Sequence, residues 1–585
     1  MLSQTYTPEC LKRILLPREA WHPYPIADER EPWEALPEAV RKAHIAKGEA
    51  CLGFPWEPFR ATLFLEMART GSRTLYNRRR ARHRTALCDL VIAECVEGKG
   101  RFMDDIVDGV WAACEESFWG KPFTLSMQKA GFDLPDTAEP IVALFVAEAA
   151  SLLAWTSYLL GSQLDGYSSL IRPRLEREMT RRMLTPCLER DDFWWMGFEG
   201  RRVNNWNPWI NSNWLTAALL METDGERRLA AVSKSLRSLD TFIDFYPKDG
   251  GCDEGPGYWG RAGASLFDCL ELLHSATDGA INVYDRPLIK DIGRFIYRVQ
   301  IADRYFINFA DAPARLIPSP ALVFRYGRRI DDAHMSALGA WAAQQRNVAE
   351  IGFSDSIGRQ LPALFTMTQL TKVTPCQPLP RDVWLPEIQV MAARDQEGRC
   401  EGFYVAAKGG HNAESHNHND VGHFIVYMDG KPVIVDAGVE TYTGKTFSQQ
   451  RYDIWTMKSA YHSLPTIDGV MQRAGRKFAA TEVSYARHEA RARLSLDLAR
   501  AYPPEAGLRS WVRTVTLERG REVRLEDTYE LLRPAASLSL NLLSPCRIAI
   551  EEEGRIALHG RALDADRRCG DAQIHYDADE ILVSV

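Results

Sequence analysis

The sequence lacks several patterns that would assign a function directly. It contains no G-x-x-x-x-G-K-[ST] phosphate loop, no glycine fingerprint for dinucleotides after a strand, and no G-x-S-x-G nucleophile motif. Its twelve cysteines include no C-x-x-C pair, and their wide spacing argues against both a thiolate metal cluster and a disulfide framework. We interpret them as reduced, mostly buried thiols.

The sequence also lacks a large excess of charge of one sign and has few long apolar segments. The 71 basic residues are outnumbered by 78 acidic ones, for a net charge of −7, so nucleic acid is not an expected partner. The longest apolar run, around 141–160, contains Glu148 and is interpreted as a buried helix, so no membrane partner is expected. The first residues lack a basic stretch followed by a sustained apolar run, which predicts a cytoplasmic location.

Residues 1–375 have the apolar spacing of consecutive helices joined by short connections. This pattern is typical of a helical bundle or an (α/α) toroid. The helices are expected near 140–164, 173–189, 213–222, 227–245, 262–276 and 287–302. The basic run at 77–84 is expected to be a solvated helix face or the rim of an entrance for an anionic chain.

The character of the sequence changes after a proline-rich stretch at 376–390, which we interpret as a linker. From 391 to 585 the residues alternate as in strands, and Asp429-Gly430 between two of them predicts a hairpin turn. Strands are expected at 403–408, 423–428, 432–438, 491–498, 510–518, 522–531 and 537–544. The predicted fold class is multidomain α+β, with a helical domain followed by an antiparallel β-sandwich.

Histidines concentrate in one short segment. Four of the 13 lie within 411–423, and His416 and His418 form an H-x-H pair at the expected entry to a strand. Asp436 is expected on the next strand of the hairpin, and His462 follows later. Two imidazoles and a carboxylate match the ligands that zinc accepts, although a polar loop with hydrogen-bonding histidines explains the spacing as well.

Two further clusters have unusual composition. Residues 201–214 hold five asparagines and three tryptophans, which suit stacking on sugar rings and hydrogen bonding to hydroxyl and carboxylate groups, or a helix-packing seam. The glycine-rich segment 249–263 predicts an irregular loop before a helix beginning near Gly260. It would present Asp249, Asp253, Glu254 and Tyr258 at one end of the helical domain.

Together these segments resemble the heparinase II/III superfamily of polysaccharide lyases. The resemblance rests on NNWNPWINSN (204–213), DGGCDEGPGYW (249–259), SHNHND (415–420) with VDAG (435–438), and AYHSLPTIDG (460–469). It implies an N-terminal (α/α) toroid, a C-terminal β-sandwich, and cleavage of uronate-containing glycans by β-elimination. It also implies a structural zinc in the sandwich and an anionic poly- or oligosaccharide as partner, with a homodimer left open.

The resemblance also implies roles for particular residues. Asn205 aligns with the asparagine that neutralises the uronate carboxylate, and Tyr258 and His416 with the catalytic pair that exchanges protons with the substrate. The zinc ligands would be His418, Asp436 and His462. The substrate-binding residues would be Asn204, Trp206, Arg202 and Glu254.

Some points remain open. Many relatives have a histidine where this chain has Trp206, and Asn207, Asn211 or Asn213 could be the true counterpart of Asn205. An alternative function is an inverting glycoside hydrolase on the same scaffold, with Glu254 and either Asp253 or Asp249 as acid and base. A third is an inactive, zinc-stabilised glycan-binding protein.

Overall fold

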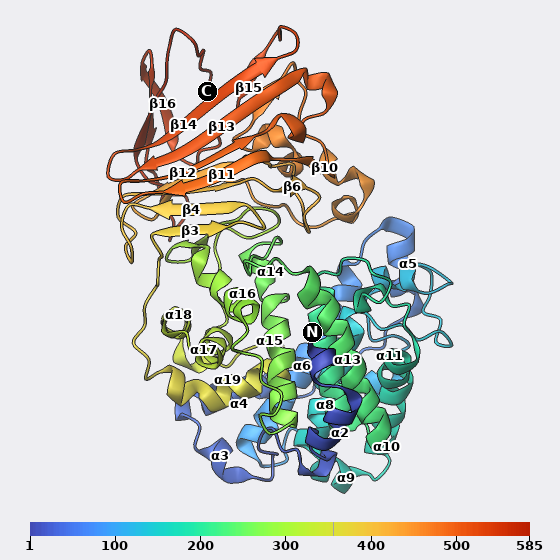
Figure 1. Cartoon of the computed structure of the whole chain (residues 1–585). Coiled ribbons are helices and arrows are strands. Elements are labelled where there is room, and N and C mark those ends of the chain that lie inside the picture. Colours follow the sequence, from blue (N-terminus) through green and yellow to red (C-terminus); the bar gives the residue numbers. More distant parts are fainter. Residues whose placement is uncertain (355) are drawn as a thin grey trace. The chain divides into compact units, whose positions relative to one another are not determined.

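The computed structural model describes residues 1–354 and 356–585, which form two compact units. The helical unit comprises residues 1–246, 260–286 and 319–375, and the strand unit comprises residues 247–259, 287–318 and 376–585. Helices therefore dominate the first part of the chain and strands the last, in the expected order (Figure 1). Two short segments of the predicted helical domain nevertheless belong to the strand unit. The boundaries 1–375, 376–390 and 391–585 stay a prediction.

The helical unit consists of helices whose inner members are buried on nearly every side. α12 packs against α8, α13 and α15, and it is apolar over most of its length. The α-helices of this unit are α1 (Leu2–Thr5), α2 (Pro8–Ile14), α3 (Arg30–Glu34), α4 (Glu38–Glu49), α5 (Ala61–Thr70), α6 (Thr74–Glu97), α7 (Met103–Glu115), α8 (Leu144–Leu159), α9 (Gly161–Tyr167), α10 (Ile171–Met179), α11 (Thr185–Glu189), α12 (Trp206–Met221), α13 (Gly225–Phe245), α15 (Gly263–Ala276), α17 (Pro320–Arg329), α18 (Ala333–Gln344) and α19 (Ile357–Leu370).

The long apolar stretch predicted as one helix is divided into α8 and α9. Almost all of α8 is buried, as expected for an inner helix. Within the described residues, no single helix is long and apolar enough to cross a membrane. Taken together, α8 and α9 have sufficient length and apolar composition, but they are bent by 82° at their junction. The predicted helix at 287–302 also ends early, because Gln300–Ala302 forms a short strand.

The strand unit contains antiparallel sheets joined by turns. A five-stranded sheet has the order β3-β4-β5-β7-β8, and a four-stranded sheet has the order β11-β12-β13-β14. The unit includes α14 (Pro256–Trp259), α16 (Pro287–Arg298), β1 (Gln300–Ala302), β2 (Tyr305–Phe306), β3 (Asp382–Leu385), β4 (Val390–Arg394), β5 (Phe403–Lys408), β6 (His411–Asn412), β7 (Phe424–Met428), β8 (Lys431–Ile434), β9 (Pro465–Ile467), β10 (Gly475–Ala479), β11 (Thr481–Arg487), β12 (Arg491–Asp497), β13 (Leu508–Glu518), β14 (Glu522–Leu531), β15 (Leu538–Leu540), β16 (Arg547–Glu552), β17 (Arg555–His559) and β18 (Ala572–His575).

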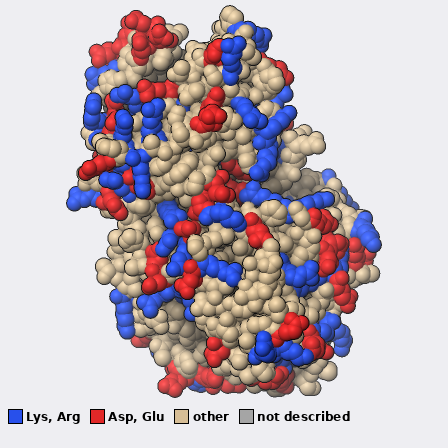
Figure 2. Space-filling model, viewed as in Figure 1, with Lys and Arg blue, Asp and Glu red and all other residues tan. Residues whose placement is uncertain are grey.

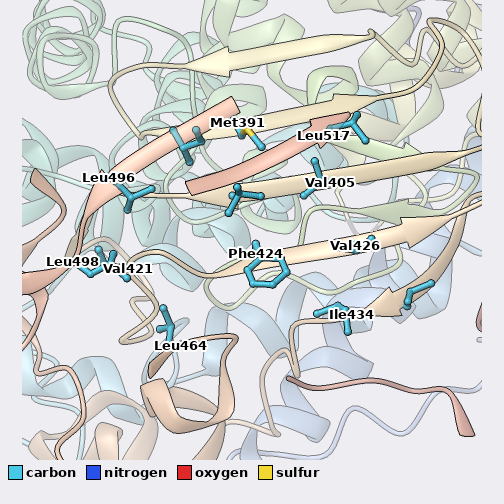
Figure 3. Close-up of a cluster of buried hydrophobic side chains, with 14 of the residues drawn as sticks. Met391, Val405, Val421, Phe424, Val426, Ile434, Leu464, Leu496, Leu498 and Leu517 are labelled. Atoms are coloured by element: carbon cyan, nitrogen blue, oxygen red, sulfur yellow. The ribbon is translucent and has the colours of Figure 1, made fainter. Parts of the chain in front are cut away.

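The predicted hairpin is present between β7 and β8. Asp429 and Gly430 both have positive φ, at 51° and 70°, as a two-residue hairpin turn of the primed type requires. The segment interpreted as a linker contains β3, which pairs with β4. Side chains from the two larger sheets meet in one apolar core, in which Met391, Val405, Phe424 and Leu496 are almost fully buried (Figure 3).

The surface carries charges of both signs. On the face shown in Figure 2, acidic and basic side chains are interspersed. This distribution agrees with the nearly balanced totals of acidic and basic residues in the sequence.

Candidate active site

The strand unit brings together three of the predicted site residues. Tyr258 lies on the short helix α14, and His416 lies in the loop between β6 and β7. Their rings stack with centroids 4.1 Å apart and an interplanar angle of 27°. The Nε2 atom of His416 lies 3.7 Å from Oε2 of the buried Glu254. These three side chains thus form one polar site within a single unit.

Two glycines explain how α14 reaches this position. A Cβ atom on Gly255, whose φ is +84°, would lie 2.6 Å from the Cβ of Ala312. A Cβ on Gly257 would lie 2.6 Å from Cδ of Pro313. Only glycine permits this approach, so the glycine-rich loop packs directly against the segment that carries Asp311.

No sequence motif singled out Asp311, although four side chains converge on it. Its Oδ2 accepts hydrogen bonds from Nδ1 of His416 at 2.7 Å and from the Tyr442 hydroxyl at 2.8 Å. Its Oδ1 accepts from Nε2 of His418 at 3.0 Å and from Nη2 of Arg451 at 2.8 Å. Burial alone would raise the pKa of Asp311, but the hydrogen bonds from the two histidines and the charge of Arg451 hold it well below its usual range.

Tyr442 is a second residue that sequence reasoning missed. Its hydroxyl lies 2.6 Å from that of Tyr258. Because Tyr442 donates its proton to Asp311, Tyr258 is the donor in the contact between the two phenols. Burial raises the pKa of Tyr258 to about 12, so its phenol carries a proton at neutral pH. Tyr452, the other tyrosine of this region, accepts a hydrogen bond from the Asn417 amide instead.

The backbone of the site is strained at two residues. Ala310, which precedes Asp311, has a φ of 58°, and His416 has a φ of 56°. Such left-handed conformations are unfavourable for residues other than glycine and concentrate at functional sites. The H-x-H pair was expected at the entry to a strand, but the chain turns at His416 and β7 begins only at Phe424.

A buried ion cluster holds this loop in place. The ammonium of Lys408, at the end of β5, donates to Glu414 and to Asp420, each at 2.8 Å. The side chains of all three are at least nine-tenths buried, and the ammonium offsets part of the cost of burying two carboxylates. Burial raises the pKa of Glu414 to about 7. The loop segment containing His416 and His418 is thereby attached to the five-stranded sheet at both ends.

The predicted metal ligands His418, Asp436 and His462 also come together. One ligand atom from each lies within 4.8 Å of the others, and all three residues are buried. Nδ1 of His418, Oδ2 of Asp436 and both ring nitrogens of His462 have no hydrogen-bond partner. Buried polar atoms without partners are costly, so the residues present fit a zinc ion bound by two imidazoles and a carboxylate. Asp436 lies just beyond β8, which ends at Ile434, rather than on the strand as predicted.

His423 borders this group and approaches it with one ring nitrogen. Its Nδ1 accepts the backbone N–H of Ser463 at 2.9 Å, so the neutral ring carries its proton on Nε2. That Nε2 lies 3.1 Å from Oδ2 of Asp436. Nε2 of His423 also has no hydrogen-bond partner, so it faces the same carboxylate oxygen as the predicted ligands.

Two carboxylates of the hydrolase alternative, Asp249 and Asp253, accept hydrogen bonds from the backbone. Oδ1 of Asp249 accepts the N–H of Gly251, and Oδ2 accepts those of Glu387 and Ile388. Asp253 accepts the N–H of Ser415 at 3.4 Å. Residues 249–259 of the glycine-rich segment belong to the strand unit, where Gly255 and Gly257 pack against the 310–313 segment, whereas residues 260–263 belong to the helical unit.

The remaining predicted residues lie in the helical unit. Asn205 is the N-cap residue of α12 and is 3% exposed. The Asn204 side chain accepts the N–H of Trp206, whose ring lies 5.0 Å from that of Trp194. Arg202 is exposed. These four residues thus surround the amino end of a buried helix, where the helix dipole is positive.

The other asparagines of the cluster differ in their surroundings. The fully buried Asn207 amide donates to the carbonyls of Trp195 and Ser238. Asn211 donates to the Asn207 carbonyl and to the Ser238 hydroxyl. Both are therefore committed to internal packing. Asn213 donates to the Trp209 carbonyl and is only half-buried.

A cavity of about 230 Å³ lies inside the helical unit beside Asn213 and Trp209. Arg261 stacks over the Trp209 ring at 4.1 Å. The charged lining consists of Arg80, Arg84, Arg261, Arg325, Arg329 and Arg359 with Glu148, Asp268 and Glu271. Arg80 and Arg84, from the basic run at 77–84, line this cavity and do not form a solvated face, because their helix turns that side inward.

Comparison with known proteins identifies part of the chain. Residues 383–569 match the family model of the heparinase II/III-like C-terminal domain. A search of curated proteins found no significant match. The family match covers the segment with His416 and all three predicted metal ligands.

Solved structures extend the similarity to nearly the whole chain. The match to a heparinase III gene product has a TM-score of 0.59 at 13% identity and covers 95% of this chain and 80% of that one. A second heparinase III structure gives 0.57 at 12% identity, covering 94% and 84%. The heparan sulfate lyase HepC from Pedobacter heparinus gives 0.56 at 12% identity, covering 97% and 84%. These likenesses confirm the predicted toroid-plus-sandwich fold.

Proposed function

Because its C-terminal domain and its fold are those of the heparinase II/III-like polysaccharide lyases, we propose that this protein cleaves uronate-containing glycans by β-elimination. The observation that carries the proposal is the cluster of Tyr258, His416 and Asp311 in the strand unit. It offers one group able to take a proton and one able to give a proton, and β-elimination needs both.

The hydrogen bonds assign these two roles. The ionised Asp311 can only accept, so Nδ1 of His416 carries a proton and Nε2 has a free lone pair. We assign Nε2 of His416 as the base that removes the C5 proton of the uronate. The nearby Glu254 carboxylate stabilises the imidazolium that results. Tyr258 keeps its proton at neutral pH and is assigned as the acid that protonates the departing O4 oxygen.

The C5 proton is weakly acidic, so the carboxylate beside it must be neutralised as negative charge develops. We assign this role to Asn205, which lies at the positive end of the α12 dipole. The arginine-lined cavity of the helical unit, with its tryptophan and asparagine side chains, suits an acidic sugar residue of the substrate. A glycosaminoglycan- or alginate-like glycan is therefore the proposed substrate class.

We further propose that His418, Asp436 and His462 bind zinc. The donor set is one that zinc accepts, and the partnerless atoms are all buried. Zinc would supply a fixed anchor for the loop that carries His416. The proton transfers and the charge neutralisation are carried out by His416, Tyr258 and Asn205.

The proposal is tested by recording ultraviolet absorbance while the protein is incubated with a panel of uronate polymers and oligosaccharides. Elimination creates a conjugated 4,5-unsaturated uronate that absorbs, and hydrolysis does not. Rising absorbance supports the lyase and identifies the substrate. New reducing ends without absorbance would overturn it in favour of the hydrolase, and binding without turnover would favour the glycan-binding protein.

A further inference from the structure

The two histidines of the H-x-H pair point different ring nitrogens at the same carboxylate. His416 uses Nδ1 and His418 uses Nε2, and both bond to Asp311. The two remaining nitrogens therefore face different surroundings. Nε2 of His416 lies beside Glu254, whereas Nδ1 of His418 is buried without a partner among the predicted metal ligands.

From this geometry we propose that Asp311 is a positioning residue that fixes the tautomers of both histidines at once, and so links the reacting group to the metal site. The inference rests on the function proposed above. A carboxylate that only accepts hydrogen bonds forces each contacting nitrogen to carry the proton. The free lone pair is thereby placed on Nε2 of His416 for the substrate and on Nδ1 of His418 for the metal.

Asp311 is suited to this role because it is held on every side. Its side chain is fully buried, and Arg451 balances its charge while also donating to the carbonyls of Asn417 and Thr446. The strained backbone at Ala310 is maintained by the packing of the glycine-rich loop against Ala312 and Pro313. One anchored carboxylate thus fixes the positions of both rings.

The first test is Asp311→Asn, measured by turnover and by the rate at which a chromophoric chelator removes zinc. An amide presents an NH₂ group to one of the two histidines, and that ring must then change tautomer. We expect kcat to fall on the order of 10²- to 10⁴-fold with KM changed little, because orientation of a catalytic histidine acts on the transition state. Zinc release should accelerate about 10- to 100-fold.

A double variant separates the two effects. In a His416→Ala background, Asp311→Asn should cost little further turnover but should still accelerate zinc release. The control is Asp332→Asn, at the N-cap of α18, where asparagine caps equally well. If Asp311→Asn folds and changes neither kcat nor zinc release while His416→Ala abolishes turnover, the inference fails and the proposed function stands. If His416→Ala retains full turnover, the proposed function itself fails.

A measurement on the unmodified chain avoids any dependence on variant folding. Selective ¹⁵N labelling of histidine, with the two signals assigned from His416→Ala and His418→Ala, reports which ring nitrogen carries the proton. We expect His416 as the Nδ1–H form and His418 as the Nε2–H form with zinc on Nδ1. The opposite tautomer on either ring would overturn the inference.

Discussion

Tyr258 and His416 lie face to face, with ring centroids 4.1 Å apart. A stacked phenol favours a positively charged imidazole, because the face of an aromatic ring is negative. The ring of Tyr258 would therefore stabilise His416 after it accepts a proton, while the hydroxyl acts on the leaving group. The ring and the hydroxyl can be tested separately.

Tyr258→Phe removes the hydroxyl and keeps the stacking ring. We expect folding and saccharide binding to persist and kcat to fall about 10²- to 10⁴-fold, the usual loss for a general acid. The measurement is initial rate by ultraviolet absorbance. Tyr529→Phe, on the exposed face of β14, serves as the matched control. Near wild-type turnover in Tyr258→Phe would remove Tyr258 from the mechanism.

The pH dependence follows from the raised pKa of Tyr258. A general acid must carry a proton in order to donate it. With a pKa of about 12, Tyr258 stays protonated at pH values at which an ordinary phenol, with a pKa of about 10, is already ionised. We expect kcat/KM to stay level from about pH 8 to about pH 10.5 and to decline only as the pH approaches that pKa. Circular dichroism would verify folding over this range. A steady rise of kcat/KM with pH would instead indicate that the phenolate is the base.

Removal of a metal ligand should act on stability. His418→Ala is expected to lose about one zinc per chain and to lower Tm, because a site formed only in the folded state couples metal affinity to folding. Elemental analysis and thermal melting measure the two effects. His423→Gln, beside the site, should retain zinc with about 10- to 100-fold weaker affinity. Wild-type protein without bound zinc after purification in zinc-containing buffer would contradict the assignment.

The Lys408 cluster predicts a large loss of stability. Lys408→Met leaves two buried carboxylates, Glu414 and Asp420, without their cation, which costs about 3–5 kcal/mol. Urea denaturation measures this change, and Lys431→Met, at an exposed hairpin position, is the control. A loss below about 1 kcal/mol would indicate that the carboxylates find another partner or take up protons.

Two variants distinguish the asparagine with a catalytic role from one with a structural role. Asn205→Ala should lower kcat with little change in Tm, whereas Asn207→Ala should cost about 1–3 kcal/mol of stability, because the carbonyls of Trp195 and Ser238 lose their donor. Turnover and thermal melting are measured for both. If Asn205→Ala is fully active, Asn213, beside the cavity, becomes the next candidate.

Several local features could be predicted because their causes lie within a few residues. The Asp429-Gly430 turn, the strands at 403–408 and 522–531, and the buried inner helix α8 follow from turn chemistry and apolar periodicity. His416 was expected at the entry to the strand at 423–428, and the structure instead has a left-handed turn there, eight residues before β7 begins.

The order of helices and strands and the lyase-like motifs could be read from the amino-acid sequence, because periodicity, turn residues and short motifs are local properties. The meeting of Asp311 and Tyr442 with Tyr258 and His416 arises only when the chain folds. The tertiary structure also places residues 249–259 of the glycine-rich segment in the strand unit. Asp311 is 105 positions from His416 in the sequence, and Tyr442 is 184 positions from Tyr258. Their meeting depends on the close packing of backbone at Gly255 and Gly257, which no local pattern specifies.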